Sequence, residues 1–206
     1  TTDTPNHRVL HFDHQPVAKG TELIEDFLTS IQQKTPLKFE YKAFTETVAS
    51  VVHLHPYLLK EYNNRWFCVG YCNVREKIMH IALDRIQGTV RPLKSTYIEN
   101  TFFNPDTYFS DIIGVTRNNR PKEKVVLEFS AERAGYVRTK PLHHSQQIVK
   151  EWANGKMRVQ IEVIPNKELI ATLLSYGKDV KVLAPEAVKE EVVRLLEACL
   201  QQYHKR

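Results

Sequence analysis

The chain has 206 residues, of which 42% are hydrophobic and 26% charged, and its formal net charge is +5. This composition is ordinary for a globular protein of one or two domains and argues against a disordered chain. No apolar run approaches the roughly 18–20 residues that cross a bilayer, and no signal-peptide pattern starts the chain, so we expect a cytoplasmic protein without a membrane partner.

The N-terminal region predicts a strand, a helix and then a hairpin. Residues 8–12 alternate enough for a short strand. Thr21 offers a cap for a helix whose residues Ile24, Phe27, Leu28 and Ile31 form one apolar stripe. Residues 37–44 and 48–55 predict a hairpin. We expect residues 1–35 to pack on the following domain or on a dimer partner.

Residues 51–87 are the stretch around which we expect the chain to be organised. They predict consecutive short strands with polar turns at residues 61–64 and 73–76. Apolar or aromatic side chains occupy both faces of the strand at residues 65–72. A strand buried on both faces suits a small closed barrel, which we place at residues 36–115.

The second half of the chain changes in pattern and in charge. Residues 116–124 have the Asn, Pro and charge content of a linker. The chain from Thr116 on carries 17 Lys and Arg against 11 Asp and Glu, which favours a polyanionic partner or, equally, serves solubility. Residues 125–206 predict the order β-α-β-β-α-β, with a hairpin at Asn154-Gly155, an Asn166 helix cap and a C-terminal helix after Pro185. This α+β order is that of a ferredoxin-like domain.

A series of motifs resembles the WYL domain of bacterial transcriptional regulators. They are Pro56 to Leu59, Trp66-Phe67-Cys68 in place of Trp-Tyr-Leu, Gly70-Tyr71 and Leu83-Asp84-Arg85-Ile86. The chain from Leu127 on resembles the WCX extension that commonly follows this domain. The resemblance implies an Sm-like or SH3-like barrel with a ligand-sensing surface that includes Arg85. It also implies that promoter DNA is read by a helix-turn-helix upstream, a segment outside this chain, which begins at Thr1 rather than at a methionine.

Catalytic and metal-binding patterns are weak. His53 and His55 share a strand parity, but no third ligand is identifiable, so we interpret them as ordinary strand histidines and expect no metal. His143-His144 precedes Ser145, but adjacency alone does not make a nucleophilic site. The three cysteines lack CxxC spacing, and no phosphate-binding or nucleophile motif occurs. We therefore expect neither a cofactor nor an enzyme.

The predicted activity is anion binding, since aromatic side chains stack on bases and cations hold phosphates. The candidate ligand-binding residues of the barrel are Tyr41, Lys60, Trp66, Tyr71, Arg75, His80 and Arg85. Arg133 and Gln146 of the second domain are expected to extend this surface across the interdomain cleft. Trp66 has a competing role in the core, and Arg85 has a competing role as the partner of Asp84.

The leading hypothesis is the effector-sensing region of a WYL-family transcriptional regulator. Its effector would be a single-stranded oligonucleotide or a nucleotide, bound near the barrel, and the protein would act as a homodimer. The alternative is a stand-alone accessory module that binds single-stranded nucleic acid, or an adaptor that binds another protein. A winged helix-turn-helix upstream of Thr1 would favour the regulator.

Overall fold

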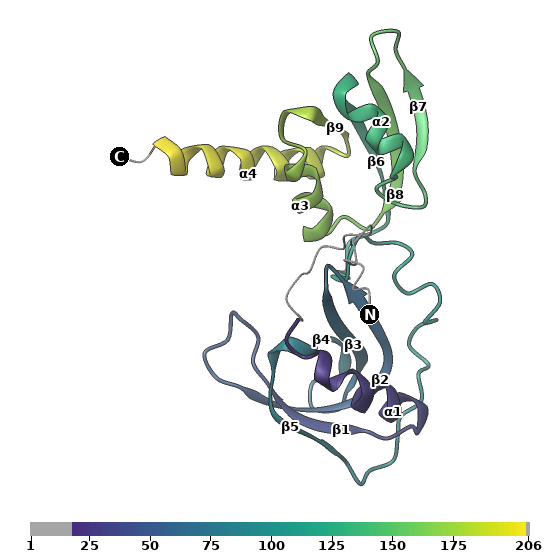
Figure 1. Cartoon of the computed structure of the whole chain (residues 1–206), viewed down its shortest axis with the longest axis vertical. Helices are drawn as coiled ribbons and strands as arrows, with labels where there is room; N and C mark the ends of the chain where they lie inside the picture. Colours follow the sequence, from purple (N-terminus) through teal and green to yellow (C-terminus); the bar gives the residue numbers. More distant parts are fainter. Residues whose placement is uncertain (1–17, 205–206) are drawn as a thin grey trace, which may run out of the picture. The chain divides into compact units, whose positions relative to one another are not determined.

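The computed structural model describes residues 18–204, and the contacts divide the chain into two units between Glu99 and Asn100 (Figure 1). Each unit has its own antiparallel sheet, and the described residues contain four α-helices, so the fold is mixed α and β. The predicted strand at residues 8–12 lies outside the described residues. The segment predicted as a linker, residues 116–124, falls in the second unit by its contacts.

The first unit is built on five strands. They are β1 (Leu37–Tyr41), β2 (Ser50–Tyr62), β3 (Arg65–Cys72), β4 (Lys77–Ala82) and β5 (Ile86–Pro92). A 3-10 turn, η1 (Thr21–Leu23), leads into the helix α1 (Ile24–Gln32), and a second 3-10 turn, η2 (Leu83–Arg85), separates β4 from β5. The predicted turn at residues 73–76 is confirmed, and that at residues 61–64 is confined to Asn63 and Asn64, because β2 continues to Tyr62; Asn63, Asn64 and Glu76 have positive φ angles.

The strand order of this sheet is β4-β3-β2-β1-β5, with antiparallel neighbours throughout. Within residues 18–204 no ladder joins β4 to β5, so a closed barrel is not confirmed. The chain passes from one edge of the sheet to the other through η2. The β2–β3 ladder shifts register between Pro56 and Leu58, because proline has no N–H to donate and a bulge accommodates it.

The core of the first unit forms between α1 and the sheet. Phe27 of α1 is fully buried, and its ring centroid lies 5.8 Å from that of Phe39 in β1. Burial of one such side chain contributes about 1.5–3 kcal/mol. The predicted cap at Thr21 is wrong, because its hydroxyl donates to the Ala18 carbonyl and Leu23 is the residue that precedes α1.

The second unit alternates strands and helices in the predicted order β-α-β-β-α-β. Its elements are β6 (Glu123–Phe129), α2 (Ala131–Thr139), β7 (Gln147–Glu151), β8 (Met157–Val163), α3 (Lys167–Ser175), η3 (Gly177–Asp179), β9 (Val180–Ala184) and α4 (Glu186–His204). The sheet order is β7-β8-β6-β9. The predicted Asn166 cap is confirmed, since its side-chain oxygen accepts from the Leu169 N–H at 2.9 Å. Ser130 precedes α2 as predicted, but its hydroxyl donates to Asp179 instead of capping the helix.

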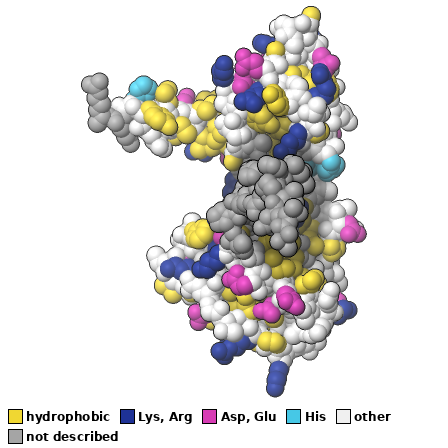
Figure 2. Space-filling view, viewed as in Figure 1, with side chains coloured by type: hydrophobic (Ala, Val, Ile, Leu, Met, Phe, Trp, Pro, Cys, Tyr) yellow, Lys and Arg dark blue, Asp and Glu magenta, His cyan; other side chains and the backbone are white. Residues whose placement is uncertain are grey.

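One face of the second sheet and the helices enclose its core. Alternate residues of β8 are buried, α2 contacts β6, and α4 contacts β9 and α3. The later turns of α4 carry exposed apolar side chains, visible in Figure 2 along this helix; they are Val193, Leu196, Leu200 and Tyr203. None of the helices in residues 18–204 is both long and apolar enough to span a membrane.

Candidate anion-binding site

A hollow of about 390 Å³ in the first unit gathers cations around an exposed aromatic ring. We call it the Arg85 pocket. Its charged and aromatic lining residues are Lys19, Lys42, Phe44, Glu46, Asp84 and Arg85. It combines positive charge with a ring face, which are the two features that bind phosphates and bases.

Backbone contacts fix the wall of the Arg85 pocket. Arg85 ends η2, and its carbonyl accepts from the Lys42 N–H at 3.2 Å, so the two cations come from paired segments. Gly20 lies against η2 with φ +91°, and a Cβ at this position would stand 2.5 Å from the Leu83 carbonyl carbon. Only glycine permits this close approach, which brings Lys19 to the pocket.

The Arg85 guanidinium lies over a ring that is itself open to solvent. Its Cζ is 4.4 Å from the centroid of Phe44, and the Cζ of Arg65 is 5.9 Å from the same centroid. Phe44 is 71% exposed. A ring so exposed gains little from burial, and cation–π attraction to the two guanidinium groups contributes about 0.5–1 kcal/mol at an exposed site.

One carboxylate serves both arginines. Asp84 lies 3.5 Å from Arg65 Nε and 3.9 Å from Arg85 Nε, and the second distance is too long for a hydrogen bond. Arg85 Nε is buried without a hydrogen-bond partner in the described structure. Within residues 18–204, Lys19 and Lys42 form no ion pair, while the other lining carboxylate, Glu46, lies 3.7 Å from Arg75. The pocket therefore retains positive charge for an anion.

None of the other predicted residues of the first unit lines this pocket. Tyr41 is buried in the core, and Trp66 is half-buried and packs against it. Arg75 donates to the Ser50 hydroxyl at 3.0 Å. The remaining three lie along the sheet; they are Lys60 in β2, Tyr71 in β3 and His80 in β4. Of the nine candidate residues, Arg85 is the one that lines the pocket.

The two candidates in the second unit have local partners. Arg133 of α2 lies 3.4 Å from Asp179. The amide of Gln146 accepts from the Leu142 N–H and donates to the Val137 carbonyl, each at 3.0 Å. Both contacts stabilise the second unit itself, and a ligand-binding role for these residues stays a prediction.

Four residues at the Arg85 pocket were not predicted from the sequence: Lys19, Gly20, Lys42 and Phe44. Lys19 and Gly20 precede α1, and Lys42 and Phe44 follow β1. Gly20 was the one usable signal in the sequence, because glycine permits a close approach of two backbone segments. The pairing that brings the three segments together depends on the register of β1 with β5, which the sequence alone does not specify.

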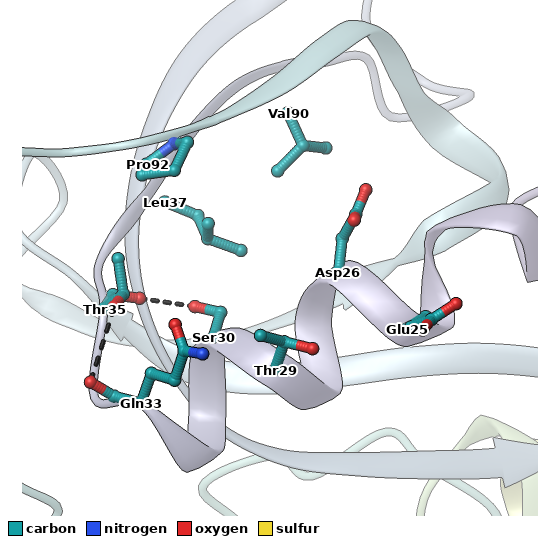
Figure 3. Close-up of a pocket in the computed structure, with 9 residues that line it drawn as sticks. All are labelled: Glu25, Asp26, Thr29, Ser30, Gln33, Thr35, Leu37, Val90 and Pro92. Carbon is teal, nitrogen blue, oxygen red and sulfur yellow. Dashed lines mark hydrogen bonds between the residues drawn. The ribbon is translucent and has the colours of Figure 1, made fainter.

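A second hollow of the first unit has the opposite chemistry. It has a volume of about 300 Å³ and lies between α1 and strands β1 and β5 (Figure 3). Asp26 points from α1 toward Val90, and Glu25 is the other charged lining residue. No Lys or Arg lines this hollow in the described chain, so it does not suit an anion.

The two histidines considered as metal ligands have different surroundings. His55 is fully buried, and its Nδ1 accepts from the Ile98 N–H at 2.9 Å. Tyr57 donates to the Ile98 carbonyl at 2.9 Å, and Tyr97 donates to Pro56, so residues 97–98 are held against β2. Burial lowers the pKa of His55 and raises that of Tyr57 to about 12. Residues 18–204 contain no group of three or more His, Cys, Asp and Glu that could hold a metal.

The His143 and Ser145 pair is part of the framework of the second unit. His143 Nδ1 lies 2.7 Å from the Ser145 hydroxyl, which also accepts from the Glu162 N–H at 2.8 Å. Burial lowers the pKa of His143. These bonds tie the segment before β7 to β8, which accounts for the pair without nucleophilic chemistry.

Comparison with known proteins identifies both halves of the chain. Residues 22–90 match the model of the WYL domain, and residues 121–200 match the model of the WCX domain. No curated protein matches the chain.

Two solved structures are similar over most of the chain. Proteasome accessory factor B/C (PafBC) of Arthrobacter aurescens is 24% identical over 89% of this chain and 28% of its own, with a TM-score of 0.42. A CRISPR Cas-related protein is 14% identical over 90% of this chain and 53% of its own, with a TM-score of 0.55, and shares the fold. The chain thus spans 28% and 53% of the lengths of these two proteins.

Proposed function

Because the chain carries a WYL domain followed by a WCX domain, as the sequence motifs predicted, we propose that it is the ligand-sensing region of a transcriptional regulator. Its ligand is a nucleic-acid or nucleotide-like anion, bound at the Arg85 pocket. Ligand binding controls a helix-turn-helix that belongs to the same protein. Coupling of this kind requires the ligand to prefer one of two arrangements of the protein.

The observation that carries this proposal is the Arg85 guanidinium over the exposed Phe44 ring, beside two lysines without an ion pair in residues 18–204. This arrangement suits a nucleotide, because its base can stack on the Phe44 ring while its phosphate lies among Lys19, Lys42 and Arg85. Stacking of one base on an aromatic side chain is worth about 1–3 kcal/mol. We expect the ligand to be bound rather than transformed, because no Ser, Thr, Cys or His is among the described residues that line the pocket.

The test is ligand binding by the 206-residue chain at two salt concentrations. The probes are nucleoside monophosphates and 5′-phosphorylated oligothymidylates. Arg85→Gln removes one pocket cation, and Lys77→Gln removes one exposed cation of β4 as the matched control. A hydrogen bond to a charged group is worth about 1.5–3 kcal/mol, so we expect Arg85→Gln to weaken binding about tenfold or more.

The salt dependence gives a second readout. Loss of one phosphate contact lowers the slope of log affinity against log salt by about 0.7 for a single strand. Equal affinities and slopes for Arg85→Gln and Lys77→Gln would remove Arg85 from the site. Nucleotides recovered after incubation should be unchanged, and their turnover would contradict a binding function.

We also propose that the protein is a homodimer and that α4 contributes to the interface between copies. The exposed residues Val193, Leu196, Leu200 and Tyr203 follow the 3-4 spacing of a coiled-coil seam, which supports this pairing. Leu196→Glu should then shift sedimentation toward the monomer. We further propose that the first sheet is an Sm-like barrel left open between β4 and β5. The second unit is then a ferredoxin-like sandwich.

A further inference from the structure

The outward face of strands β5, β1 and β2 carries two cationic side chains and a histidine in one row, away from the Arg85 pocket. In the sheet register, Lys38 of β1 stands opposite Arg91 of β5 on one side and opposite His53 of β2 on the other. Directly opposite residues of antiparallel strands have Cβ atoms about 4.5–5.5 Å apart. The three side chains therefore form one row across three strands.

Two members of the row, Lys38 and Arg91, line a hollow of about 490 Å³ on the sheet face, and His53 stands beside Lys38. The outward lining residues of the hollow are Lys38, Glu40, Val51, Gln87, Thr89 and Arg91. Lys38 and Arg91 are exposed, and His53 is half-exposed. Gly88 also lines the hollow, and because it has no side chain its backbone stays accessible from the hollow.

The two cations of this row, Lys38 and Arg91, form no ion pair within residues 18–204. Like charges directly opposite each other destabilise a sheet, and sheets commonly place opposite charges at such pairs. Glu40 lines the same hollow, but it stands opposite Val51 and Gln87 rather than opposite either cation.

We propose that Arg91, Lys38 and His53 form a second anion-binding site, which takes a phosphate-type oxyanion. The Arg91 guanidinium supplies a planar pair of hydrogen-bond donors, and the Lys38 ammonium supplies a point charge. The His53 imidazole supplies a further ring nitrogen. A bound oxyanion offsets the repulsion along the row. Glu40 opposes the anion and sets an upper limit on its affinity.

The second site and the Arg85 pocket lie along the same pair of strands. Gln87 lines both hollows, and Lys38 and Lys42 are four residues apart along the chain. At about 3.3 Å per residue the two lysines are about 13 Å apart. A single phosphate reaches one site only, whereas a linear phosphodiester of several units reaches both. This link between the sites rests on the proposed function of the Arg85 pocket.

The test compares two double variants of the 206-residue chain. Lys38→Gln with Arg91→Gln removes two charges from the row, and Lys77→Gln with Lys94→Gln removes two exposed charges of the same unit as the control. The probes are inorganic pyrophosphate, a 5′-phosphorylated thymidine dinucleotide and an oligothymidylate of eight units. We expect the row variant to weaken octamer binding at least fivefold beyond the control and to lower the salt slope by about 1.4, for two phosphate contacts.

The short probes and a gain-of-binding variant separate the outcomes. Of the two sites, the dinucleotide can stack on a phenyl ring only at Phe44 of the Arg85 pocket, so its tighter binding should respond to Arg85→Gln and not to the row variant. Pyrophosphate cannot stack, and the row variant should remove one of its two binding events. Glu40→Gln should tighten octamer binding about threefold, an effect that misfolding cannot produce, since one nearby like charge is removed.

Several results would overturn the inference. If the row variant and the control bind the octamer with equal affinity, the second site is refuted. If Arg85→Gln still weakens binding in that case, the proposed function of the Arg85 pocket stands without the second site. A loss in the row variant with no loss in Arg85→Gln supports the second site and contradicts the Arg85 pocket. Absence of binding of all three probes to the unmodified chain contradicts both.

Discussion

Replacement of Gly20 by alanine tests whether the close approach of the chain to η2 builds the Arg85 pocket. Gly20 has φ +91°, and an added Cβ would meet the Leu83 carbonyl carbon at 2.5 Å and the Asp84 nitrogen at 2.6 Å. A left-handed conformation costs an ordinary residue about 1–2 kcal/mol. Because the atoms that it meets belong to the backbone, relief of the clash costs about 1–3 kcal/mol more.

Gly88 provides the matched control. It also has a positive φ, +68°, but an added Cβ there would have no atom within 4 Å. Gly88→Ala should therefore lower the free energy of unfolding by about 1–2 kcal/mol, from the backbone conformation alone. Gly20→Ala should lower it by about 2–5 kcal/mol, because it adds the clash to the same conformational cost.

Urea denaturation followed by Trp66 fluorescence measures both variants. The chain has two tryptophans, one in each unit, so a Trp152→Phe background leaves Trp66 as the reporter of the first unit. Affinity for the octamer should fall in Gly20→Ala and not in a variant of equal stability elsewhere, since Lys19 moves with residue 20. Equal unfolding free energies for the Gly20 and Gly88 variants would refute the reasoning.

Three further predictions concern the ring, the buried histidine and the Asn166 cap. Phe44→Ala should leave stability within about 0.5 kcal/mol, because the ring is mostly exposed, and should weaken nucleotide binding by about 1–3 kcal/mol in titration calorimetry. Burial holds the pKa of His55 below 6.5, so the unfolded chain takes up the proton first, and stability should fall as the pH drops below 6.5. His55→Asn should reduce this slope in Trp66-monitored urea titrations at pH 7.5 and 5.5, and an unchanged slope would assign it to other groups. Asn166→Ala removes the helix cap and two side-chain hydrogen bonds, to the Ile113 and Thr116 carbonyls at 2.8 Å. It should lower the free energy of unfolding of the second unit by about 2–3 kcal/mol in urea denaturation. A loss below about 0.5 kcal/mol would contradict these bonds.

Much of the second unit could be predicted from local sequence signals. The Asn154-Gly155 turn, the Asn166 cap and the Pro185 boundary each depend on a few neighbouring residues, and the observed elements follow them. The Ser130 and Thr21 hydroxyls show the limit of this reasoning. Each has a competing partner, Asp179 or the Ala18 carbonyl, and only the folded chain decides which bond forms.

The first unit was harder to predict because its sheet depends on long-range pairing. The turns near Asn63 and Glu76 are local and were found, whereas the place of β1 between β2 and β5 is not local. Arg85 was found through its family motif. Lys42 and Phe44 were missed, because their proximity to Arg85 arises from the β1–β5 register.

In the Arg85 pocket, Asp84 is the counter-ion of both Arg65 and Arg85. A carboxylate buried with a single cation would be left unpaired if that cation turned to a ligand, at a cost of several kcal/mol. Asp84 keeps Arg65 as a second neighbour, so Arg85 is released without stranding a negative charge. If the Arg85 pocket binds an anion as proposed, Arg85 can turn to it while Asp84 keeps Arg65 as its partner.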